Sequence, residues 1–136
     1  AGTIDGLKFA HERSRVAGRL TLAALPRLAE SGASAADVAY ALHGGANAEG
    51  RPSLRVLAEG SVELACQRCL QPLAVPVRVD AELELAESLA AAEGAKDEVD
   101  RVVASRSMDV AALVEDEVLL DLPMVALHEH CELPAK

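Results

Sequence analysis

Apolar and polar residues alternate on both sides of a short cysteine segment in the middle of the chain. From Leu73 to Leu85 every second residue is apolar, and most of the residues between them are polar. The same alternation, less regular, leads from Val62 into Cys66. A period of two places the apolar side chains on one face of a strand. We therefore predict an antiparallel hairpin over residues 62–85, with Cys66–Cys69 near its tip.

Shorter alternating stretches predict more strands. Val38–Leu42 and Leu54–Ala58 each alternate, and residues 44–52 between them are rich in turn-forming glycine, asparagine and proline. Val16–Leu22 and Val99–Ala104 are further extended candidates. Gly60 interrupts the run before the hairpin and predicts a bulge or bend. Together these stretches predict a meander of about four strands.

Two stretches have helical spacing instead. Leucines recur every third residue within Leu22–Glu30, where Pro26 fits only in the first turn, so the helix should begin near Leu25. Asp109–Leu122 is the stronger helix, because Ser107 or Asp109 is able to cap it and a proline follows directly. The predicted fold class is therefore α+β: an antiparallel β-meander, a C-terminal α-helix packed on it and a short N-terminal helix.

Length and composition indicate one domain over residues 1–136, with residues 1–15 flexible. Half of the residues are apolar, but Phe9 and Tyr40 are the only aromatic residues, so leucine, valine and alanine must form the core. No run approaches the ~18 apolar residues that span a bilayer, so we expect no membrane contact. Three cysteines are too few for a secreted disulfide framework and favour a cytoplasmic location.

The charge of the chain is unevenly distributed. Residues 1–78 have a balance of +2 and residues 79–136 one of −11, which gives the net charge of −9. An acidic half repels phosphate, and stacking on single-stranded RNA needs aromatic rings. We therefore expect a basic protein partner rather than direct RNA binding by this chain alone, with simple solubility as the alternative role of the acidic half. Three carboxylates are predicted on the polar sides of their elements: Glu82, Glu84 and Glu115.

The helix over 109–122 carries an acidic run, Glu115-Asp116-Glu117. On a helical wheel Glu117 and Asp121 fall among the apolar residues, and a buried carboxylate needs a partner. Arg68 and Arg78 are the two candidate basic partners, and Arg68, at the hairpin tip, is predicted to lie near the carboxylates of this helix or of the tail. A cleft is the alternative, and for Asp121 we prefer solvent at the helix end. We take Arg68 and the three acidic residues as candidate binding residues.

The cysteines suggest two kinds of chemistry. Zinc takes four nitrogen or sulfur ligands, usually from two close pairs. Cys66 with Cys69 is one pair, and His128 with Cys131 has the same spacing. These four residues are the predicted ligands of a structural zinc site, and packed cysteines beside a solvated histidine tail are the alternative. A redox pair is less well supported, because its first cysteine belongs at a helix N-terminus, where the thiol pKa falls.

Three segments together resemble the YceD family of small bacterial and chloroplast proteins. They are Leu64–Cys69 with the following Pro72-Leu73, the helix and Leu-Pro of Asp109–Val125, and the pair His128 and Cys131. The resemblance is strongest over about 60–132.

The resemblance implies a non-catalytic factor that supports the accumulation of large-subunit ribosomal RNA during ribosome assembly. Its expected partner is a ribosomal or pre-ribosomal protein or particle. The alternative hypothesis is a metal-dependent or thiol redox enzyme centred on Cys66 and Cys69. No paired acid and base or phosphate-binding glycine loop accompanies the carboxylates, so we expect no enzyme.

Overall fold

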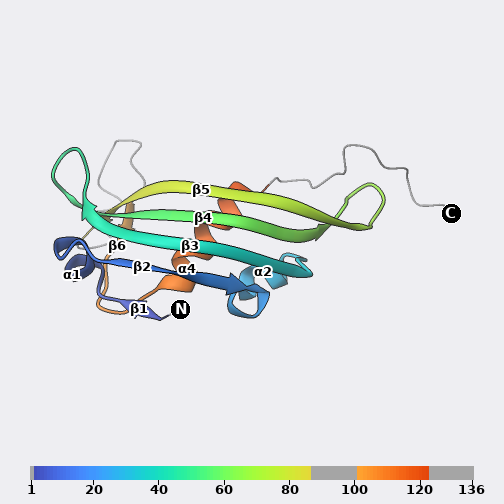
Figure 1. Ribbon diagram of the computed structural model, residues 1–136, viewed down its shortest axis with the longest axis horizontal. Helices are drawn as coiled ribbons and strands as arrows, with labels where there is room; N and C mark the ends of the chain where they lie inside the picture. Colours follow the sequence, from blue (N-terminus) through green and yellow to red (C-terminus); the bar gives the residue numbers. More distant parts are fainter. Residues whose placement is uncertain (1, 87–100, 123–136) are drawn as a thin grey trace.

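The computed structural model describes residues 2–86 and 101–122. A five-stranded sheet forms the body of the molecule, with the strand order β2-β3-β4-β5-β6 (Figure 1). Its strands are β2 Arg15–Thr21, β3 Ala35–Ala46, β4 Pro52–Ala65, β5 Pro72–Ala86 and β6 Arg101–Val103. The first four are antiparallel neighbours, whereas β6 runs parallel to β5. The sheet is therefore mixed rather than purely antiparallel.

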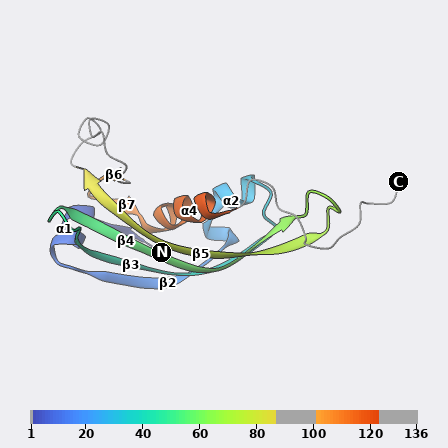
Figure 2. The ribbon, with the colours of Figure 1, turned by 90° about the horizontal axis from the view of Figure 1, so that it is seen from above.

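Within the described residues, four helical segments and a small second sheet accompany the large sheet. They are α1 Gly6–His11, the 3-10 turn η1 Leu22–Ala24, α2 Pro26–Glu30, α4 Val110–Asp121, and the strand pair β1 Thr3–Ile4 with β7 Met108–Asp109. Both α2 and α4 lie on the concave side of the curved sheet (Figure 2). A mixed sheet with a C-terminal helix agrees with the predicted α+β class.

The alternating pattern places one apolar face of the sheet against these helices. Val38 of β3, Val56 of β4 and Val77 of β5 are fully or almost fully buried, as are Val114 and Val118 of α4. Each side chain of this kind contributes roughly 1.5–3 kcal/mol when it leaves water. The predicted hairpin is present, since β4 and β5 pair from Ser53–Glu84 to Ala65–Pro72.

The ends of the helices follow from local sequence. Asp109 caps α4 by accepting hydrogen bonds from the backbone N–H groups of Ala111 and Ala112, as predicted for this residue. Pro26 occupies the first turn of α2, as its fixed φ requires. Residues 3–11, for which the pattern indicates no element, form β1 and α1. The alanine- and glutamate-rich stretch over residues 86–96, whose composition indicates a helical turn or a loop, lies almost entirely outside the described residues.

Of the bulge or bend predicted at Gly60, the bulge is wrong. Gly60 pairs in unbroken register with Val38 on one side and Val77 on the other. A Cβ atom at this position would lie 2.0 Å from the carbonyl oxygen of Asp37. The glycine therefore allows the backbone of β3 to approach closely. Close approach of another backbone is, besides a bulge, a common reason for glycine inside a strand.

Candidate functional site

The two cysteines lie where the sequence places them, in the tight turn that joins β4 to β5. The backbone N–H of Cys66 donates to the carbonyl of Gln71 at 2.9 Å, and that of Leu70 donates to the carbonyl of Cys66 at 2.8 Å. Cys66 is buried and Cys69 is half-buried. The turn is thus closed by its own backbone and extends beyond the helices at one end of the molecule (Figure 1).

Leu70 in this turn combines two uncommon properties. Its φ of 64° lies in the left-handed region, which costs free energy for a residue with a branched side chain. Its side chain is also 65% exposed. Glycine would adopt this backbone at lower cost, and a polar residue would be better solvated. Folding alone therefore gives no reason for a leucine here.

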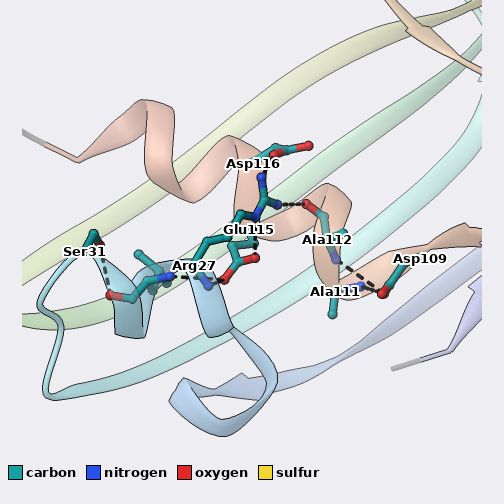
Figure 3. A network of polar contacts seen from close by, with 8 residues as sticks. Arg27, Ser31, Asp109, Ala111, Ala112, Glu115 and Asp116 are labelled. Atoms are coloured by element: carbon teal, nitrogen blue, oxygen red, sulfur yellow. Dashed lines mark hydrogen bonds and ion pairs between the residues drawn. The ribbon is translucent and has the colours of Figure 1, made fainter.

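The acidic run on α4 meets α2 rather than the hairpin tip. Glu115 is only 2% exposed, and both of its carboxylate oxygens are engaged (Figure 3). Oε2 accepts from the backbone N–H groups of Arg27 at 2.9 Å and Leu28 at 3.2 Å, and Oε1 accepts from Nε of Arg27 at 2.8 Å. The N-cap residue that precedes α2, Leu25, has no side chain able to cap these N–H groups. Glu115 supplies that cap from a distant part of the chain.

Arg27 extends the contact along α4. Its Nη1 donates to Oδ1 of Asp116, and its Nη2 donates to the carbonyl of Ala112 at 3.0 Å. The hydrogen bonds from Arg27 to Glu115 and then to Asp116 raise the pKa of the guanidinium further above its ordinary value. One planar side chain therefore holds two carboxylates and a helix carbonyl in a fixed arrangement.

The matched part of the chain contains both the hairpin tip and α4. A family model described as "Large ribosomal RNA subunit accumulation protein YceD" matches residues 54–136. The chain belongs to the YceD family. This confirms the resemblance found in the sequence. No solved structure matches the chain.

The match to YceD covers β4 from Leu54 onward, β5, β6, β7 and α4, whereas β2, β3 and α2 precede it. The contact between Arg27 and Glu115 thus joins a helix outside the matched region to one inside it. Sequence reasoning missed Arg27 as the partner of the acidic helix. The unused signal was the absence of a capping side chain before Pro26.

The predicted binding residues have different surroundings. Arg68 is exposed in the cysteine turn, and Glu117 is half-buried. Asp121 accepts a hydrogen bond from the backbone N–H of Arg78 at 3.1 Å, so one of the two predicted basic residues does meet the helix, but through its main chain. The carboxylate that is buried on α4 is Glu115.

A second buried carboxylate lies on β5 at the opposite end of the sheet. Glu84 is 3% exposed, and its Oε1 accepts from Nδ2 of Asn47 at 2.9 Å, with Nε of Arg51 at 3.9 Å. Asn47 lies in the turn between β3 and β4, where its own Oδ1 accepts from two backbone N–H groups. The prediction that Glu84 and Glu115 lie on polar, solvent-facing sides is therefore wrong, because folding brings a partner over each.

The predicted zinc site is only half contained in the described residues. Cys66 and Cys69 are there, whereas His128 and Cys131 lie outside them. Within residues 2–86 and 101–122, no group of three or more histidine, cysteine or acidic side chains is placed to hold a metal ion. The four-ligand site stays a prediction. The helices in these same ranges include none long and apolar enough to cross a membrane.

Proposed function

We propose that this YceD family member is a non-catalytic factor in ribosome biogenesis that acts in the cytoplasm. It supports the accumulation or processing of large-subunit ribosomal RNA by binding a ribosomal or pre-ribosomal protein or particle. The observation that carries the proposal is the family match over residues 54–136, more than half of the chain.

The surroundings of the carboxylates refine the expected partner contact. Glu84, Glu115 and Asp116 are engaged within the fold, and Asp109 caps α4. Asp80 pairs with Arg55 across the sheet. In the described part of residues 79–136, most of the carboxylates therefore make contacts within the fold itself. This favours a contact made by shape and apolar surface over one made by the whole acidic half.

The hairpin tip fits such a contact. It lies in the matched region, presents the exposed Leu70 and Arg68, and is held by the long β4–β5 pairing. Residues held in sparsely populated backbone conformations cluster at functional sites, so the positive φ of Leu70 motivates a functional role for this turn. We propose that this turn contacts the pre-ribosomal partner.

The function is tested in a bacterial strain that lacks its own YceD family member. The wild-type chain should restore the ratio of large-subunit to small-subunit ribosomal RNA. Leu70→Gly should fail to restore it, although the protein should be as stable as wild type or more so, because glycine tolerates the positive φ. Leu120→Ala is the matched control, since it removes a leucine that is 79% exposed on α4. Full restoration by Leu70→Gly would exclude the tip, and no effect of the wild-type chain would exclude the function.

The non-catalytic role of the cysteines has its own test. The hairpin places them before a strand rather than at a helix N-terminus, which is not the setting that activates a thiolate. Cys66→Ser with Cys69→Ser should keep RNA accumulation if the double variant still folds, as judged by circular dichroism. Zinc bound by the purified wild-type protein and lost from the folded variant would support the predicted metal site. Because this turn is also the proposed contact, the enzyme hypothesis would be favoured by a folded double variant that still binds the pre-ribosomal partner but no longer supports RNA accumulation.

A further inference from the structure

Strand β2 is an edge of the five-stranded sheet (Figure 1). It pairs with β3 over its full length, from Arg15 opposite His43 to Thr21 opposite Asp37. No other strand of the described residues pairs with its outer side. An edge of this kind offers its backbone to an incoming strand.

The register shows which groups point outward. The backbone N–H of Gly44 donates to the carbonyl of Ser14 at 2.8 Å. Ser14 and Gly44 are therefore a hydrogen-bonded pair. Every second residue of an antiparallel strand is hydrogen-bonded to the same neighbour, so Val16, Gly18 and Leu20 also direct their N–H and C=O groups toward β3. The alternate residues direct their N–H and C=O groups away from β3. These are Arg15, Ala17, Arg19 and Thr21, and all four are exposed.

The side chains of this edge are basic. Arg15 and Arg19 lie on the same face with the small Ala17 between them, and Arg13 precedes the strand. From Arg13 to Thr21 the chain has no carboxylate. Asp37 binds Nε of Arg19 at 2.7 Å, which leaves the terminal nitrogens of this guanidinium for another acceptor. The charge of the edge is thus opposite to the net charge of the chain.

The other face of the edge carries the single tyrosine of the protein. A Cβ atom on Gly18 would lie 2.8 Å from Oη of Tyr40 and 3.0 Å from Cε1. The phenol ring therefore rests directly against the backbone of β2. A strand added beside Gly18 would change the surroundings of this ring.

We propose that β2 is the docking site for an extended acidic segment of a partner protein, which adds to the sheet as a further strand. Backbone hydrogen bonds to the outward groups would give affinity, and carboxylates opposite Arg15 and Arg19 would give specificity. A second copy of this chain fits less well, because each β2 would bring arginines and no carboxylate. The site lies before residue 54, outside the matched region, and it does not depend on the proposed function.

The probe for this site is a capped hexapeptide of alternating glutamate and valine, with a lysine–valine peptide as the charge control. Binding is followed by the fluorescence of Tyr40 and by hydrogen exchange of backbone amides. The acidic peptide should change the fluorescence saturably and protect the amides of Arg15, Ala17, Arg19 and Thr21. The lysine peptide should bind at least tenfold more weakly.

Three protein variants and two modified peptides separate strand addition from general charge attraction. Ala17→Pro removes an outward N–H and no bond to β3, so it should weaken binding about tenfold. Arg15→Glu should weaken binding by a similar factor, while Arg78→Glu, the same charge change on the distant β5, should leave it within twofold. In the peptide, N-methylation of the glutamates should abolish binding, because their N–H groups face β2. N-methylation of the valines should not.

Several results would overturn the proposal. One is the absence of a saturable change in Tyr40 fluorescence when the acidic peptide is added. The others are equal affinities of the glutamate and lysine peptides, or an affinity that N-methylation of the glutamates leaves unchanged. The last test needs no protein variant, so it decides the question even if Ala17→Pro fails to fold. Sedimentation that shows dimers broken by Ala17→Pro would assign the edge to a second copy instead.

Discussion

Two arginine–carboxylate pairs of the same chemistry occur in opposite settings. Arg27 and Glu115 join α2 to α4, where the carboxylate side chain is only 3% exposed. Arg55 and Asp80 join β4 to β5 on the outer face of the sheet, with side-chain exposures of 55% and 57%. The second pair has the better fork geometry, with hydrogen bonds of 2.9 and 2.7 Å to the two carboxylate oxygens.

The difference between the pairs is what remains when one partner is removed. Without Glu115, two backbone N–H groups at the start of α2 lose their acceptor under a packed helix. An unsatisfied buried group costs its full desolvation free energy. Without Asp80, water solvates the Arg55 guanidinium and little is lost. Burial, more than geometry, decides the contribution of a pair.

The largest expected effect comes from breaking the buried pair. Glu115→Ala should lower the free energy of unfolding by about 3 kcal/mol, because it removes three hydrogen bonds to a charged acceptor and uncaps α2. Urea denaturation followed by circular dichroism measures this loss. Asp116→Ala is the control, since its side chain is 52% exposed and also contacts Arg27. A loss no greater than that of the control would show that burial does not matter here.

A smaller effect is expected at the other buried carboxylate. Asn47→Ala removes the neutral amide donor to Glu84 and the acceptor that closes the turn before β4. We expect a loss of about 1–2 kcal/mol, below that of Glu115→Ala because the missing donor carries no charge. Thermal unfolding of both variants in the same buffer tests the order. Equal losses would mean that the charge of Arg27 adds nothing to the cap at α2.

The smallest effect is expected at the exposed pair, and it should depend on pH and salt. The hydrogen bond from Arg55 holds the pKa of Asp80 below its ordinary value of 3.8 in the folded protein. A carboxylate with a lowered pKa stabilises the fold above its unfolded pKa, and this contribution is lost as the pH falls through the folded value.

The difference in melting temperature between wild type and Asp80→Asn should therefore be small and constant near neutral pH. It should shrink below pH 3.8 and also in 1 M salt, where exposed charges are screened. A difference that persists at low pH would show that Asp80 acts through packing or hydrogen bonding rather than through its charge.

Much of the fold follows from the order of residues along the chain. The alternation over residues 73–85 predicts β5, and the partner strand and the tip with Cys66 and Cys69 are adjacent in sequence. Asp109 directly precedes α4 and caps it, and Pro26 begins α2 because its φ is fixed. These features depend on local periodicity and local hydrogen bonds, which neighbouring residues determine. The family was also recognisable from such local segments.

The tertiary structure alone decided which polar groups are buried. Glu115 and Arg27 are 88 residues apart, and Asn47 and Glu84 are 37 apart. A helical wheel shows which side of α4 carries carboxylates, but the sequence does not show that α2 covers Glu115 and lacks a cap of its own. The exposed edge of β2 has the same origin, since a strand is an edge only through the order of the whole sheet. Burial and pairing between distant segments are properties of the packed chain, because each depends on what the fold brings alongside.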